Sequence, residues 1–124
     1  MMSKRNYMYY NRNPWELNEE DCVCRALSAA LNIEYVAVNN LLDLISEVNR
    51  CDKLCVCCYH RLLEEIFGLH PANGGGRTVG EVAEDHPGHK VIIRIEGHLT
   101  CSMYGVILDT WDCTDELADC YWVV

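Results

Sequence analysis

Apolar side chains recur every three or four residues along the first half of the chain, which is the spacing of one helix face. The pattern predicts helices over residues 19–31, 35–49 and 52–67. Asn18 or Asp21 can cap the first helix, and Gly68 ends the third. The second helix has the broadest apolar face, made of Val36, Val38, Leu41, Leu42, Leu44, Ile45 and Val48.

The pattern changes in the second half. Thr78 and Glu81 have the spacing of a capping box, so a short helix is expected to begin there and to stop before Pro87. Runs rich in β-branched residues then predict strands over residues 90–95, 98–103, 106–111 and 121–124. Helices followed by an antiparallel sheet make an α+β fold, with the N-terminal helices packed on the C-terminal sheet.

Two stretches have no regular pattern. Residues 1–17 are expected to form an irregular N-terminal arm with a turn at Asn13-Pro14. Residues 71–76 include three consecutive glycines, Gly74 to Gly76, and are expected to form a flexible loop that can border a substrate cleft. Because too little chain lies on either side of this loop to fold alone, residues 1–124 are expected to form a single domain.

Composition excludes several classes of partner. The 19 acidic and 10 basic residues give a formal net charge of −9, which disfavours nucleic acids and anionic membranes. No apolar run reaches the roughly 18–20 residues of a membrane span, and the polar N-terminus does not have the pattern of a secretory signal. The nine cysteines, an odd number, are then expected to be mostly reduced thiols in the cytoplasm.

One cysteine, Cys22, has a position that suits a catalytic nucleophile. Cys22 falls at the predicted start of the first helix, where backbone N–H groups without helical partners favour a thiolate. If Tyr104-Gly105 is a two-residue turn, the hairpin register brings Asp109 diagonal to His98 on one face of the sheet. Thr100 and Trp111 lie on that same face, and Trp111 can shield the contact from water.

These residues fit covalent acyl transfer, in which Cys22 attacks a carbonyl, His98 moves the proton and Asp109 orients the imidazole. The Cys22 backbone N–H and a side-chain amide, from Asn11, Asn13 or Asn18, would hold the oxyanion. The alternative is that Cys22 and His98 are structural residues. Cys24 lies about 200° around the helix from Cys22, so the two cannot serve one site.

A second group of thiols follows in Cys51-x3-Cys55-x-Cys57-Cys58-Tyr59-His60. Cys51, Cys55 and Cys58 have helical i, i+4, i+7 spacing, which favours free thiols packed in the core, and no metal or other cofactor is expected. Zinc binding, completed in space by Cys113 or Cys120, and a disulfide or redox role are the alternatives.

The chain resembles small papain-like cysteine-peptidase-fold proteins of the type encoded by tailed bacteriophages and gut bacteria. The resemblance rests on Asp21-Cys22-x-x-Arg25-Ala26-Leu27, Gly97-His98-Leu99-Thr100 and residues 105–112, Gly-Val-Ile-Leu-Asp-Thr-Trp-Asp. It implies a papain-like fold with Cys22 as nucleophile, His98 as base and Asp109 as the third member. Such enzymes place a glutamine or asparagine shortly before the cysteine, and Asn18 is the nearest amide to it here.

Two functions follow as expectations. The first is a cysteine peptidase or amidase acting on a peptide, isopeptide or related acyl bond of a protein or peptide through a thioacyl-enzyme. The alternative is a catalytically inactive papain-like scaffold, or a Cys-rich zinc module, that binds another protein.

Overall fold

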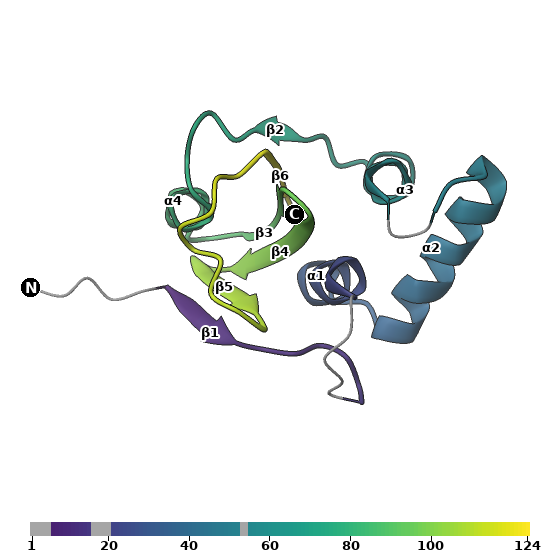
Figure 1. The fold of residues 1–124 in the computed structure, drawn as a ribbon, viewed down its shortest axis with the longest axis horizontal. Coiled ribbons are helices and arrows are strands. Elements are labelled where there is room, and N and C mark those ends of the chain that lie inside the picture. The colour runs from purple at the N-terminus through teal and green to yellow at the C-terminus, as the bar shows by residue number, and fades with distance from the viewer. Residues whose placement is uncertain (1–5, 16–20, 53–54) are drawn as a thin grey trace, which may run out of the picture.

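The computed structural model describes residues 6–15, 21–52 and 55–124. These residues form four α-helices, one π-helical turn and a six-stranded sheet (Figure 1), which confirms the α+β class. In chain order the elements are β1 (Tyr7–Tyr9), α1 (Cys22–Leu31), α2 (Tyr35–Asn49), α3 (Val56–Arg61), η1 (Leu62–Ile66), β2 (Ala72–Asn73), α4 (Val79–Asp85), β3 (Lys90–Ile95), β4 (His98–Met103), β5 (Val106–Asp109) and β6 (Cys120–Val123).

The sheet separates two layers of helices. Helices α1, α2 and α3 lie on one side of it and α4 lies on the other, as Figure 1 shows. Two buried clusters fill the spaces between the layers. One joins α1, α2 and the α3–η1 segment to Leu99 and Trp122, and the other joins α4 to Val91, Ile93 and Ile107. Helix α1 has eight buried residues in ten, so this helix, which begins at Cys22, is packed closely against its neighbours.

The sheet is mixed, not purely antiparallel. Its order is β1-β5-β4-β3-β6-β2, and β1 runs parallel to β5 with Tyr7 opposite Ile107. The expectation of an irregular arm over residues 1–17 is therefore wrong at Tyr7–Tyr9. A three-residue edge strand has too little sequence for a periodic signal, and its partner lies about a hundred residues away along the chain.

Residues 71–76 also differ from the expectation. Ala72 and Asn73 form β2 against the edge of β6, so this segment is partly ordered by the sheet. A Cβ at Gly74 would lie 1.8 Å from the Ala118 carbonyl oxygen, so only glycine fits there. Gly75 and Gly76 have positive φ and complete the turn after β2.

The third helix begins later than predicted. Cys55 is the N-cap of α3, and the chain reaches it from Arg50, which ends α2 in the left-handed conformation. The predicted range 52–67 therefore includes part of a connection, together with residues 53–54, which lie outside the described residues. Cys51 and Cys55 consequently do not share a helix face.

Other local predictions are confirmed. Thr78 and Glu81 form a reciprocal capping box at the start of α4. The β4–β5 hairpin turns at Tyr104-Gly105, both with positive φ, and Met103 pairs with Val106. This is the register that brings Asp109 toward His98.

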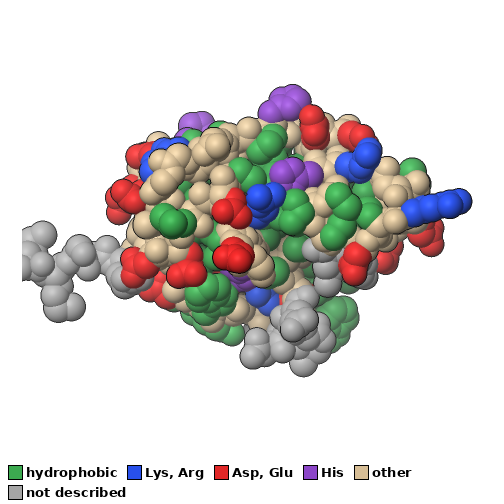
Figure 2. Space-filling model, turned by 45° about the horizontal axis from the view of Figure 1, so that its top comes forward, with side chains coloured by type: hydrophobic (Ala, Val, Ile, Leu, Met, Phe, Trp, Pro, Cys, Tyr) green, Lys and Arg blue, Asp and Glu red, His purple; other side chains and the backbone are tan. Residues whose placement is uncertain are grey.

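The surface agrees with the acidic composition. Acidic side chains are spread across the face drawn in Figure 2, as a formal net charge of −9 requires. Among the helices of the described residues, none combines the length and the apolar character needed to cross a membrane.

Candidate active site

Cys22 is the first residue of α1, and its half-buried thiol faces β4. Burial raises the pKa of this thiol. A hydrogen bond with His98, the backbone N–H of Leu99 and the charges of His98 and Arg25 lower the pKa by more than burial raises it, so the net shift is downward. Asp21 is the N-cap residue of α1, as expected, but its side chain makes no capping hydrogen bond to the helix and pairs with Arg25 instead.

His98, the first residue of β4, links Cys22 to Asp109. Its Nε2 lies 2.6 Å from Asp109 Oδ2, a short charge-assisted hydrogen bond. Because Nε2 is held by the carboxylate, Nδ1 is the ring nitrogen left for the thiol. Asp109 is 4% exposed, and its second oxygen accepts the N–H of Thr110 at 2.7 Å.

The electrostatics of the site favour an ion pair. Burial lowers the pKa of His98, but hydrogen bonds with Asp109, Cys113 and Cys22 raise it to about 11. Burial raises the pKa of Asp109, and the hydrogen bond and charge of His98 outweigh this and lower it. The three shifts act in one direction: they favour the thiolate of Cys22, the imidazolium of His98 and the carboxylate of Asp109.

Arg25 and Asp21 complete the network, whereas the sequence predicted Asp21 only as a possible helix cap and no contact of either residue with Asp109. The Arg25 guanidinium, 8% exposed, contacts the Asp21 carboxylate and lies 3.8 Å from Asp109 Oδ1. Asp21 also accepts hydrogen bonds from Asn13 and from the Tyr35 hydroxyl, at 3.0 and 2.7 Å. The i, i+4 spacing of Asp21, the N-cap of α1, and Arg25 could have indicated from the sequence that these two residues form an ion pair.

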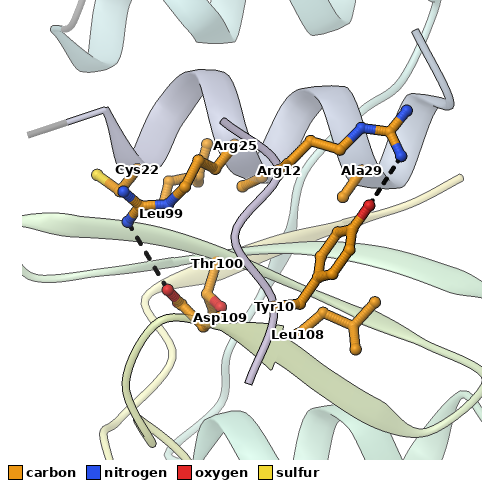
Figure 3. Close-up of a pocket in the computed structure, with 10 residues that line it drawn as sticks. Tyr10, Arg12, Cys22, Arg25, Ala29, Leu99, Thr100, Leu108 and Asp109 are labelled. Carbon is orange, nitrogen blue, oxygen red and sulfur yellow. Dashed lines mark hydrogen bonds and ion pairs between the residues drawn. The ribbon is translucent and has the colours of Figure 1, made fainter. Parts of the chain in front are cut away.

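Figure 3 shows this region behind Cys22, with Arg25 reaching from α1 to Asp109 on β5. Tyr10 and Arg12 close the other end, where Arg12 donates to the Tyr10 hydroxyl at 3.0 Å (Figure 3). The cavity between them measures about 10 Å³, which is room for no more than one water molecule. This side of the site is therefore a packed support and does not hold a substrate.

The open side is a groove of about 510 Å³. Cys22 and His98 lie in its wall, with the α3 start on one side and the β3–β4 turn on another. Apolar side chains and charged ones share the lining, which includes Val23, Val56, Ile95, Arg94, Glu96 and Asp119. The lining residues do not include Gly74 to Gly76, so the expectation that this loop borders the cleft is not met in the described groove.

Two further residues predicted to line the site, Trp111 and Thr100, lie close to His98 and Asp109, whereas Cys24 does not. The Trp111 ring lies 5.1 Å from the His98 ring, centroid to centroid, and is 43% exposed. Thr100 is buried and lines the small cavity beside Asp109 (Figure 3). Cys24 is buried, and its thiol donates to Asn39 at 3.8 Å, so it takes no part in the site.

Of the three side-chain amides expected as oxyanion donors, Asn11 and Asn13 lie in the described residues. Asn18 lies outside the described residues. Asn13 is excluded, because its amide nitrogen donates to Asp21 and its amide oxygen accepts the Trp15 N–H. The Asn11 amide oxygen accepts the Asn13 N–H. The first-turn N–H groups of α1, at Cys22 and Val23, remain beside the thiol.

His98, Asp109 and Cys113 also place their ligand atoms within 4.8 Å of one another. They bond to each other, since the Cys113 thiol donates to Asp109 Oδ2 at 3.8 Å and His98 shares that oxygen. An imidazole that is protonated on both nitrogens has no lone pair for a metal. The group is therefore better suited to holding a proton than to holding an ion.

Comparison of the chain with protein-family models, with curated proteins and with solved structures found no match.

Proposed function

We propose that this chain is a cysteine hydrolase, a peptidase or amidase with a papain-like fold, that cleaves a peptide, isopeptide or related acyl bond. The observation that carries the proposal is the continuous contact from Cys22 through His98 to Asp109, at the wall of an open groove. The resemblance of the motifs around these residues to papain-like proteins also supports it.

In the first half of the reaction, the Cys22 thiolate attacks the substrate carbonyl carbon and forms a tetrahedral oxyanion. The N–H groups at the start of α1 are placed to stabilise that negative charge. His98 then gives its proton to the leaving nitrogen, the C–N bond breaks, and an amine and a thioacyl-enzyme result.

In the second half, neutral His98 takes a proton from water as the water oxygen attacks the thioacyl carbon. The C–S bond breaks, a carboxylic acid is released, and the Cys22 thiolate and His98 imidazolium are restored. Asp109 stays ionised throughout and holds the imidazole by Nε2, so that Nδ1 faces the sulfur. No oxidant or cofactor is needed.

The experiment is hydrolysis of pooled fluorogenic peptide amides by wild type, Cys22→Ala and Cys24→Ala. Cys24 is the matched control, because it is on the same helix and outside the groove. We expect cleavage that Cys22→Ala abolishes and Cys24→Ala retains. Failure of a peptidyl vinyl sulfone to add to Cys22 under conditions in which the protein is folded would contradict the proposal.

A further inference from the structure

A second cluster of thiols lies where the connection from α2 meets the start of α3. The sulfur atoms of Cys51, Cys55 and Cys57 lie within 4.8 Å of one another. All nine cysteines of the chain are in its described part, and all nine are free thiols. The active-site network does not use these three.

Core packing explains only part of this cluster, because Cys51 and Cys55 pack against the core of α1, α2 and α3 but Cys57 does not. Cys57 is exposed and Cys51 and Cys55 are half-buried, whereas thiols that serve as small apolar groups are usually buried. Cys58 does behave in that way, because it is fully buried and donates its thiol proton to the Leu42 carbonyl. Arg50 ends α2 and Cys55 is the N-cap of α3, and the thiols of Cys51, Cys55 and Cys57 lie together near these two helix ends.

The spacing suits a soft divalent ion. Thiolates bound to tetrahedral zinc at about 2.3 Å lie roughly 3.8 Å from one another. The three sulfurs are already within 4.8 Å of one another, and those of Cys55 and Cys57 are 2.6 Å apart. That pair must separate by about 1 Å on metal binding. Cys57 is exposed and has the freedom to do so.

We propose that Cys51, Cys55 and Cys57 bind one Zn²⁺ ion through three thiolates, with water in the fourth position. Each thiol releases its proton to solvent as its sulfur binds the metal. Cys55 and Val56 also line the groove that contains Cys22 and His98, so the ion would fix one wall of that groove. The zinc site does not depend on the hydrolase proposal, since it uses neither Cys22 nor His98.

The test uses the full chain, reduced and treated with a chelator that is then removed, and titrated with Co²⁺ alone. We expect one Co²⁺ per chain, with a thiolate-to-cobalt charge-transfer band and visible bands of tetrahedral cobalt, and displacement by one equivalent of Zn²⁺. Cys51→Ser and Cys57→Ser should lose more affinity than the roughly 10- to 100-fold that loss of an outer-shell partner costs. Cys120→Ser, a half-buried cysteine outside the cluster, should bind as wild type does.

Because Cys57 is exposed, Cys57→Ser is expected to fold, and circular dichroism checks this. Absence of the charge-transfer band in folded wild type would overturn the proposal. So would a band that survives in both Cys51→Ser and Cys57→Ser. A band that is lost in His98→Ala but kept in Cys57→Ser would place the metal at His98, Asp109 and Cys113, and would also overturn it.

Discussion

The Arg25 guanidinium lies 3.8 Å from the Asp109 carboxylate, on the oxygen opposite the one that holds His98. Both side chains are less than a tenth exposed. The same guanidinium contacts Asp21, so one buried cation lies between two buried carboxylates. Arg25 is thus a positioning residue that connects α1, which carries Cys22, to β5, which carries Asp109.

We expect Arg25→Met to destabilise the fold by about 3–5 kcal/mol, because it leaves buried carboxylates without a cation. Urea unfolding followed by tryptophan fluorescence measures this. The control is Arg61→Met, which removes an exposed i, i+4 pair with Glu65 and should cost no more than about 0.5 kcal/mol. Equal effects of the two substitutions would contradict a supporting role for Arg25.

The β4–β5 turn gives a second prediction. Tyr104 and Gly105 both have positive φ, a conformation that costs an ordinary L-residue about 1–2 kcal/mol and that asparagine tolerates better. Tyr104→Asn should therefore stabilise the protein by about 0.5–1 kcal/mol, and Gly105→Ala should destabilise it by about 1–2 kcal/mol. Thermal unfolding compares the three proteins. Destabilisation by Tyr104→Asn would show that the register of the hairpin depends on something other than this turn.

The His98–Asp109 pair predicts a pH dependence of stability. The pKa of His98 is raised in the folded protein, so the imidazolium stabilises the fold fully below its unfolded value of about 6.5, and this contribution is lost as the pH rises toward about 11. The pKa of Asp109 is lowered in the folded protein, so ionised Asp109 stabilises the fold above about pH 4. This stabilisation is lost as the pH falls through the pKa of Asp109 in the folded protein.

The measurement compares Cys22→Ser with Cys22→Ser/His98→Gln, so that the thiolate does not contribute to the difference. Urea unfolding should show a larger stability difference between them at about pH 5 than at about pH 9. A difference that grows with pH would mean that His98 is neutral in the folded protein.

Much of this site could be predicted from local sequence signals. Two-residue turns fix hairpin register, so Tyr104-Gly105 was enough to bring Asp109 to His98. A capping box is also a signal between residues close in sequence, and the Thr78–Glu81 pair correctly predicted the start of α4. Cys22 was placed correctly at a helix start because the apolar spacing of α1 begins there.

Features that depend on distant pairing were not predicted. β1 is three residues long and is defined by its pairing with β5, about a hundred residues away. The contact of Arg25 with Asp109 depends on the approach of α1 to β5, which no local pattern encodes. The thiol cluster was interpreted as a helix face because Cys51, Cys55 and Cys58 have helical spacing, whereas α3 begins only at Val56.

The central claim is that Cys22 and His98 form a thiolate–imidazolium pair, and alkylation tests it most directly. Limiting iodoacetamide is applied to wild type and His98→Ala at about pH 6, where an unperturbed thiol with a pKa of about 8.5 is almost wholly protonated. Peptide mass spectrometry then gives the rate at each of the nine cysteines. We predict that Cys22 labels fastest in wild type and that His98→Ala reduces its rate sharply, with Cys120 unchanged. A Cys22 rate that is equal to the others, or that does not change without His98, would contradict the account.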